Sequence, residues 1–206
     1  MTRHLFAFLL AALSFGVGAE GTEPPAQPYE MMSPAQPTQS GDKIEVVELF
    51  WYGCPHCYHF EPALQAWLKK KPDDVMFRRV PALFNETWVV HARAYYAAEA
   101  LGVVDKLHQP LFDAIHQEGK RIMDEETIIK FAVSQGIPEK DFRDAYDSFA
   151  VDKKVRQAMM ATRDYGITGV PAVIVNGKYR TSPSLAGGPD DVLKVIDTLV
   201  AKERAK

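Results

Sequence analysis

Two cysteines at the end of an apolar segment constrain this chain more than any other feature. Cys54 and Cys57 are the only cysteines in 206 residues, and a proline and a histidine separate them. Residues 44–50, directly before them, have the pattern of a β-strand that is apolar on both faces. Apolar residues after them recur with the spacing of an amphipathic helix, at Phe60, Leu64, Trp67 and Leu68. The cysteines therefore lie where a buried strand ends and a helix begins.

This position at the start of a helix predicts redox chemistry. Pro55 suits the first helical position, so the sulfur of Cys54 lies near backbone N–H groups that have no partner within the helix. These donors and the positive end of the helix dipole stabilise a thiolate. His56 can donate to the sulfur or carry a positive charge beside it. Cys57 lies three residues along the helix, on roughly the same face, and can close a disulfide with Cys54.

The beginning of the chain has the features of a secretory signal peptide. Arg3 and His4 precede an apolar run over residues 5–17, and small residues follow that fit cleavage after Ala19. The run is shorter than the roughly 20 apolar residues of a membrane-spanning helix. Residues 1–19 are therefore predicted to direct a mature protein out of the cytosol, with a retained membrane anchor as the alternative.

The composition limits the kind of fold and of partner. An apolar fraction of 47% and a charged fraction of 25% fit a globular chain with one or two cores. The net charge of −3 gives no reason to expect a nucleic acid partner. Two cysteines are too few for a disulfide scaffold, which favours reactive cysteines. Residues 20–40 are proline-rich and should form a leader that stays extended or poorly ordered, or that adds an edge element.

Further strand signals lie on both sides of a long helical stretch. A strand over residues 74–80 would pair in parallel with the first strand, because a helix separates the two. A strand over 172–175, an Asn-Gly pair at 176–177 and a returning strand over 178–180 predict a hairpin. A final helix should begin at Pro189.

Between these strands the pattern is helical throughout. The predicted helices are residues 86–101, 105–117, a third that Asp124 caps and that ends at Gly136, a fourth that Pro138 opens, and 151–165. In the fourth helix, Phe142, Tyr146 and Phe149 are expected to share one stripe.

The order of these elements and three motifs resemble the DsbA family of periplasmic thiol–disulfide oxidoreductases. The motifs are Cys-Pro-His-Cys at residues 54–57, Gly-Val-Pro-Ala at 169–172 and Asn-Gly-Lys-Tyr at 176–179. The resemblance implies an α/β chain with a thioredoxin fold and an inserted all-helical domain. The expected boundaries are 41–83 and 158–206 for the thioredoxin-like domain and 84–157 for the helical insertion.

The resemblance also implies roles for individual residues. Cys54 would be the exposed nucleophile and Cys57 its buried partner. Pro171 would follow a cis peptide bond and lie against the disulfide, and Val170 would pair with an extended substrate strand. Pro62 would kink the cysteine helix, whereas by itself it indicates a helix break.

Glu48 is an acid at a position of the first strand where an apolar residue is expected. Burying an ionised carboxylate is costly unless it has a partner or a raised pKa. One interpretation is a proton acceptor for the Cys57 thiol, since the DsbA family has an acid six residues before its first cysteine. The other is a carboxylate at a strand end, satisfied by a lysine or by water.

The histidines raise the possibility of a metal site. Four usable zinc ligands lie on one helical turn, where they cannot all point at one tetrahedral centre: Cys54, His56, Cys57 and His59. His59 is expected at the surface or beside the site. The histidines of the later helices are expected to be structural: His91, His108 and His116. No metal and no cofactor is predicted.

The predicted function is donation of the Cys54–Cys57 disulfide, through a mixed disulfide, to reduced and unfolded secreted proteins. Two alternatives remain open, a disulfide reductase or isomerase on the same scaffold and a non-catalytic thioredoxin-like module that binds peptides. The resemblance implies reoxidation by a membrane quinone-linked oxidase, DsbB. The expected location is the periplasm and the expected state is a monomer.

Overall fold

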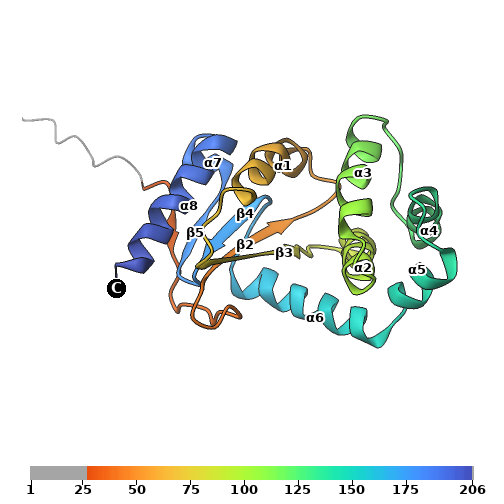
Figure 1. Ribbon diagram of the computed structural model, residues 1–206, viewed down its shortest axis with the longest axis horizontal. Coiled ribbons are helices and arrows are strands. Elements are labelled where there is room, and N and C mark those ends of the chain that lie inside the picture. The colour runs from red at the N-terminus through yellow and green to blue at the C-terminus, as the bar shows by residue number, and fades with distance from the viewer. Residues whose placement is uncertain (1–26, 206) are drawn as a thin grey trace, which may run out of the picture.

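A mixed β-sheet organises one half of the molecule, and helices form the other half (Figure 1). The structure is a computed structural model that describes residues 27–205. The predicted signal peptide, residues 1–19, and the first part of the leader lie outside the described residues. The sheet has five strands in the order β1-β5-β4-β2-β3. Their bounds are β1 Glu30–Met31, β2 Ile44–Phe50, β3 Val75–Pro81, β4 Ala172–Val175 and β5 Tyr179–Thr181.

Strand β2 lies near the middle of the sheet, and every residue after Ile44 is buried. It pairs in parallel with β3 and antiparallel with β4, and β4 pairs antiparallel with β5. Helix α1 (Pro55–Leu68) makes the predicted crossover from β2 to β3. The Asn-Gly turn at residues 176–177 also forms as predicted, with both residues at positive φ.

One face of the sheet is covered by α1 and α8 (Pro189–Arg204), with the short α7 (Pro183–Ala186) beside them (Figure 1). The apolar core beneath includes Val46, Phe60, Leu64, Val173, Ile196 and Leu199. Trp67 donates its indole N–H to Asp197 at 2.8 Å, which ties α1 to α8. The amphipathic spacing read from the sequence predicted the buried face of α1, where Phe60, Leu64 and Trp67 are buried and Leu68 is half-buried.

The remaining helices form what is called below the helical region, residues 86–164. It contains α2 Glu86–Ala100, α3 Val104–His116, α4 Glu125–Ser134, α5 Glu139–Tyr146 and α6 Phe149–Asp164. Helix α2 packs against the other four. Asp124 caps α4 as predicted, with its carboxylate accepting from the Thr127 N–H at 2.9 Å.

One detail of the helices differs from the prediction, and at Pro62 the helix continues as the resemblance implied. Phe149 does not share a stripe with Phe142 and Tyr146, because α5 ends at Tyr146 and Phe149 begins α6 with 75% of its surface exposed. Ser148 sets that break by capping α6, accepting from the Val151 N–H at 3.2 Å. Pro62 lies inside α1 without ending it, so a helix break at this proline would have been wrong.

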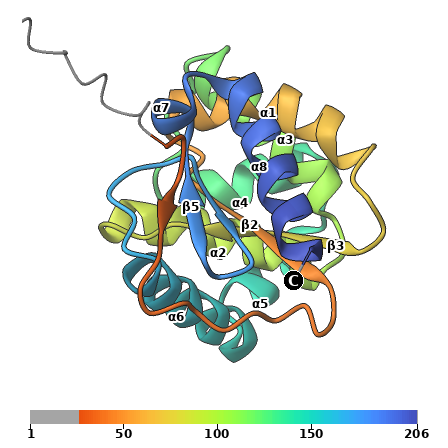
Figure 2. The ribbon, with the colours of Figure 1, turned by 90° about the vertical axis from the view of Figure 1, so that its left-hand side faces the viewer.

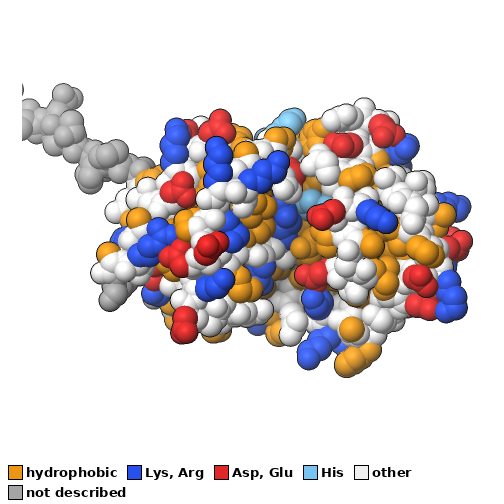
Figure 3. Space-filling model, in the orientation of Figure 1, with side chains coloured by type: hydrophobic (Ala, Val, Ile, Leu, Met, Phe, Trp, Pro, Cys, Tyr) orange, Lys and Arg blue, Asp and Glu red, His pale blue; other side chains and the backbone are white. Residues whose placement is uncertain are grey.

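The described part of the leader forms an edge element. Strand β1 pairs antiparallel with β5, and the two run side by side in Figure 2. Further along, Gln36 N–H donates to the Gly177 carbonyl at 2.8 Å. No helix within residues 27–205 is both long and apolar enough to cross a membrane. Charged side chains of both signs are distributed over the face shown in Figure 3.

Candidate active site

The residues between β2 and α1 make a tight turn that presents Cys54. Its backbone N–H donates to the Trp51 carbonyl at 3.0 Å. Gly53 leaves room for the Trp51 indole, since a Cβ at this position would lie 2.4 Å from ring carbons. The indole stacks on Trp88 of α2, with ring centroids 4.3 Å apart and planes 7° from parallel. Cys54 is the N-cap of α1 and Pro55 is its first residue, as the sequence predicted.

The two cysteines, both free thiols in this structure, have opposite environments. The largest effect on the pKa of Cys54 is a hydrogen bond that the Cys57 thiol donates to the Cys54 sulfur, which lowers this pKa. Partial burial of Cys54 acts in the opposite direction. Backbone N–H groups of Cys57 and His56 and the positive charge of His56 lower it further, and the pKa of Cys54 falls to about 6. Burial raises the pKa of Cys57 well above its usual value. The sulfur of Cys54 is therefore the one that ionises first.

The two cysteines were expected to differ in exposure, but the observed difference is small. Cys54 is 8% exposed and Cys57 is 0% exposed, so both count as buried. The prediction of an exposed Cys54 is wrong as stated, because the loop before β4 lies over its sulfur. The Cys54 thiol is 3.3 Å from the carbonyl oxygen of Val170, to which it donates.

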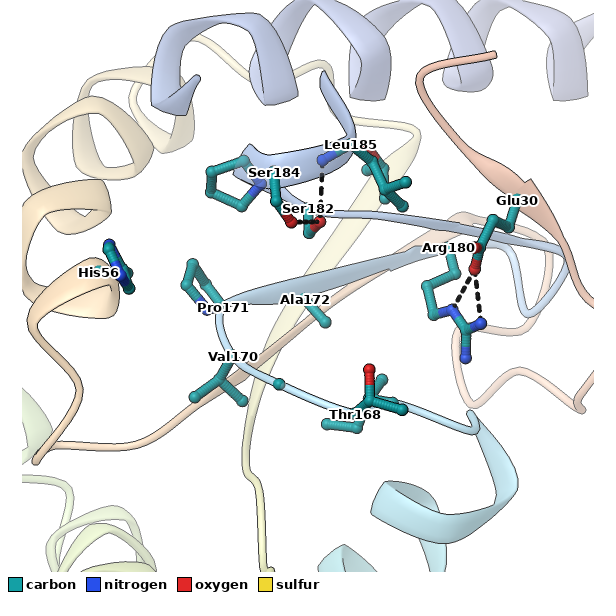
Figure 4. Close-up of a pocket in the computed structure, with 14 residues that line it drawn as sticks. Glu30, His56, Thr168, Val170, Pro171, Ala172, Arg180, Ser182, Ser184 and Leu185 are labelled. Atoms are coloured by element: carbon teal, nitrogen blue, oxygen red, sulfur yellow. Dashed lines mark hydrogen bonds and ion pairs between the residues drawn. The ribbon is translucent and has the colours of Figure 1, made fainter. Parts of the chain in front are cut away.

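That loop carries the proline predicted to face the cysteines. The peptide bond between Val170 and Pro171 is cis, as the resemblance implied. A pocket of about 470 Å³ opens beside it, lined by the 167–172 loop, by residues 180–185 and by His56 and Glu30. In Figure 4, His56 and Pro171 approach each other at one end, and the ion pair of Arg180 with Glu30 lies at the other.

A buried group of charged side chains lies beneath the cysteines. Glu48 of β2 is 1% exposed, and its carboxylate is 3.0 Å from the Arg79 guanidinium of β3. Arg79 also donates to the carboxylate of Glu61 on α1 at 2.6 Å. Because Arg79 is shared, burial dominates at Glu48 and raises its pKa to about 8. Burial also opposes ionisation of Glu61, yet His108 and Arg79, with Gln65, hold the pKa of Glu61 at about 2.

The partner of Glu48 differs from the lysine that one interpretation of the sequence named. It is Arg79, on the neighbouring strand. Glu48 and Cys57 are close enough for the carboxylate charge to raise the pKa of the thiol further. The role of Glu48 therefore stays a prediction, while its contact with Arg79 gives the acid a partner within the apolar strand.

Other polar residues of this region were not selected from the sequence. Glu61 lies four residues after Cys57, so it faces the same side of α1, and that spacing could have indicated it. Tyr52 and His108 form a buried hydrogen bond of 2.8 Å across 56 residues of sequence, and no local pattern indicates such a pair. The side chain of His59 is exposed, as predicted.

The later histidines each bond within the protein. His91 bonds the Ile122 carbonyl, and His116 bonds the Tyr52 carbonyl, both at 2.7 Å. Within residues 27–205 no three histidine, cysteine, aspartate or glutamate side chains are grouped so that they could hold a metal ion.

Relatives of this chain share its sequence over almost its whole length. A thiol:disulfide interchange protein DsbA from Pseudomonas syringae pv. tomato is 44% identical over 201 residues, covering 97% of this chain and 94% of the relative. The protein of the same name from Azotobacter vinelandii is 42% identical, covering 100% of this chain and 99% of the relative.

Solved structures agree with these relatives. The crystal structure of Pseudomonas aeruginosa DsbA has a TM-score of 0.84 and 44% identity, covering 87% of this chain and 93% of that chain. The oxidoreductase DsbA from Xylella fastidiosa has a TM-score of 0.80 and 35% identity, covering 86% and 96%. The family model described as the DSBA-like thioredoxin domain matches residues 45–194. The α/β thioredoxin fold with a helical insertion is thereby established, and the chain belongs to the family of DSBA-like thioredoxin domains.

Proposed function

We propose that this protein is a thiol:disulfide oxidoreductase that donates its Cys54–Cys57 disulfide to reduced, unfolded secreted proteins. The observation that carries the proposal is the low pKa of the Cys54 thiol, about 6, at the start of α1. A dithiol with a stabilised thiolate favours its reduced form, so the corresponding disulfide is a strong oxidant. The names of the relatives support the same type of reaction.

The reaction proceeds by two thiol–disulfide exchanges. A substrate thiolate attacks the Cys54 sulfur, the Cys54–Cys57 bond breaks, and Cys57 leaves as a thiolate that takes up a proton. The thiolate of the second substrate cysteine then attacks the sulfur of the first substrate cysteine, which is bonded to Cys54, and expels the Cys54 thiolate. Two substrate thiols are oxidised to one disulfide, and the disulfide of the protein is reduced to two thiols.

Buried Cys57 needs a proton when it leaves, and Glu48 is our candidate to supply it. With a pKa of about 8, Glu48 is protonated at neutral pH and can give its proton to Cys57. When the protein is reoxidised, Cys54 first forms a mixed disulfide with the oxidant. The Cys57 thiol then attacks the Cys54 sulfur and expels the thiolate of the oxidant, and Glu48 in its ionised form accepts the Cys57 proton. Pro55 is the first residue of α1, and the backbone N–H groups of Cys57 and His56 and the charge of His56 lower the pKa of Cys54 there.

Val170 and Pro171 are our candidates for the substrate-binding segment. The Val170 carbonyl lies 3.3 Å from the Cys54 sulfur, so a polypeptide joined to Cys54 would pass beside this backbone. An extended segment can hydrogen-bond to such a backbone without regard to its side chains. That mode of binding suits unfolded substrates of varied sequence.

Turnover requires a second partner that removes electrons from the reduced cysteines. We propose a membrane quinone-linked oxidase like DsbB, reached in the periplasm after removal of residues 1–19, and a monomeric enzyme. The signal-peptide pattern at the start of the chain supports this location.

The direction of the reaction is tested by mixing the oxidised protein with a reduced, unfolded substrate that has two cysteines. We expect loss of substrate thiols with matching formation of reduced Cys54 and Cys57, and no loss with a Cys54→Ser variant. Substrate thiols that persist, together with rapid reduction of insulin by the reduced protein, would favour the reductase alternative. No reaction in either assay would favour the non-catalytic module.

A further inference from the structure

Tyr52 precedes the cysteines by two residues and is held at both ends by helix α3. Its hydroxyl group is 2.8 Å from Nδ1 of His108, and its backbone carbonyl accepts from Nε2 of His116 at 2.7 Å. Its ring packs edge-on against Phe112, with centroids 4.9 Å apart. The three α3 residues are four positions apart and so form one face of the helix. Tyr52 is 1% exposed.

The direction of the bond to His108 follows from its other neighbour. Nε2 of His108 lies 3.4 Å from the Glu61 carboxylate, which is ionised at neutral pH because its pKa is about 2. This contact lies outside hydrogen-bond geometry, but a carboxylate only accepts, so the neutral ring is favoured with its proton on Nε2, toward Glu61. Nδ1 is then the acceptor, and the Tyr52 hydroxyl donates to it. Burial lowers the pKa of His108 and favours this neutral form.

The turn that Tyr52 belongs to is held from two sides of the helical region. Trp51 stacks on Trp88 of α2, and Tyr52 is bonded to α3, whereas Gly53 contributes no side chain. The fixed position of Tyr52, two residues before Cys54, therefore helps to determine where the Cys54 sulfur lies relative to the N–H groups of α1. We propose that Tyr52 is a positioning residue through which α3 of the helical region fixes the turn that carries Cys54, with His116 and His108 as its two anchors. This inference rests on the proposed redox role of Cys54.

Charged and titratable groups approach Tyr52 from every neighbouring element. They are Glu48 of β2, Glu61 of α1, Arg79 of β3, His91 and Tyr95 of α2, and His108 and His116 of α3. Cys54 itself faces His56 and Cys57 of α1. His116 donates from Nε2 in its neutral and in its protonated form. The anchor on the Tyr52 carbonyl therefore does not depend on the charge of His116.

Two substitutions of His116 separate its hydrogen bond from its charge. His116 is partly exposed, so neither variant has to fill a core position. His116→Gln keeps an N–H donor for the Tyr52 carbonyl, and His116→Leu removes it; both remove the titratable ring. We expect the acid ionisation constant of the Cys54 thiol to fall about threefold to tenfold in H116L, which means that its pKa rises; this is the size of effect expected from the free energy of one hydrogen bond. In H116Q the constant should stay near the wild-type value. The readout is the ultraviolet absorbance of the thiolate against pH.

A second pair of substitutions tests the hydroxyl group. Tyr52→Phe keeps the ring and removes the donor to His108, and we expect it to lower the Cys54 ionisation constant in the same direction. Tyr146→Phe is the matched control, because the Tyr146 hydroxyl is 3.5 Å from the Val90 carbonyl within the helical region. It should leave Cys54 unchanged.

Equal shifts in H116L and H116Q would attribute the effect to charge and overturn the inference. So would a wild-type ionisation constant in both H116L and Y52F. A wild-type Cys54 that titrates like an ordinary thiol would overturn the proposed function, so failure of the function and failure of the inference give different results.

Discussion

Cys54 and Cys57 lie one helical turn apart, yet the pKa is lowered at Cys54 and raised at Cys57. The start of α1 supplies backbone N–H groups and the neighbouring thiol as donors to the Cys54 sulfur, and its pKa falls to about 6. Cys57 lies one turn deeper and is completely buried, so its ionised form loses the solvation of water. A substrate attack at Cys54 therefore produces a leaving thiolate that requires a proton, which makes the buried acid Glu48 relevant.

The burial of Glu48 gives a prediction about stability. Its pKa is about 8 in the folded protein and about 4.3 in an unfolded chain. Between these values the unfolded chain releases a proton that the folded protein keeps, so stability that is present below about pH 4 is lost as the pH rises toward 8. Glu48→Gln cannot ionise. We expect its free energy of unfolding, relative to wild type, to increase by about 1 kcal/mol or more from pH 5 to pH 8.

Urea denaturation at several pH values measures this difference, with Glu86→Gln at an exposed position of α2 as the control. A difference that stays constant with pH would show that Glu48 is ionised in the folded protein. The same variant tests the proposed proton transfer, since an unchanged rate of disulfide exchange would leave Glu48 with an electrostatic role alone.

At the scale of elements, local patterns predicted most of the fold that positions the site. Strand β2, helix α1, strand β3 and the 172–180 hairpin lie where periodicity and turn residues placed them. The sequence left an edge element in the leader as an alternative but did not place the two-residue strand β1, and it did not indicate the four-residue helix α7, because segments so short carry no periodic signal. Strand β1 depends instead on β5, which is about 150 residues away in the sequence.

The contact between the leader and the hairpin gives a prediction with a built-in control. Gly177 has φ +63°, and a Cβ there would lie 2.0 Å from the Gln36 carbonyl oxygen. Gly41 has nearly the same φ, +60°, but nothing within 4 Å of an added Cβ. We expect Gly41→Ala to cost about 1 kcal/mol through its backbone conformation alone. Gly177→Ala should cost roughly 1–3 kcal/mol more, because the leader must shift.

Urea denaturation of both variants measures these costs. Equal losses in the two variants would contradict the packing of residue 36 against the hairpin, since only the conformational cost would then remain.

At the scale of the whole molecule, the helical region contributes directly to the redox site. Phe50 and Tyr52, on either side of the end of β2, pack edge-on against Phe112 and His108 of α3 and against Tyr95 of α2. The sequence indicated the cysteines, the proline loop and the helical insertion, but it did not indicate which helix would face Tyr52. Side-chain pairs across such distances depend on how the helices pack, and no local pattern of the sequence indicates that packing. The expected domain boundaries at residues 83/84 and 157/158 stay predictions.

The proposed function depends most on the ionisation of Cys54, and the rate of alkylation of this thiol against pH measures that ionisation most directly. In the reduced wild-type protein, Cys57 is buried and has a raised pKa, so the first titration reports Cys54. We predict a rate that rises with a midpoint near pH 6. A midpoint near 8.5, the value of an ordinary cysteine, would contradict the stabilised thiolate and the oxidising disulfide derived from it.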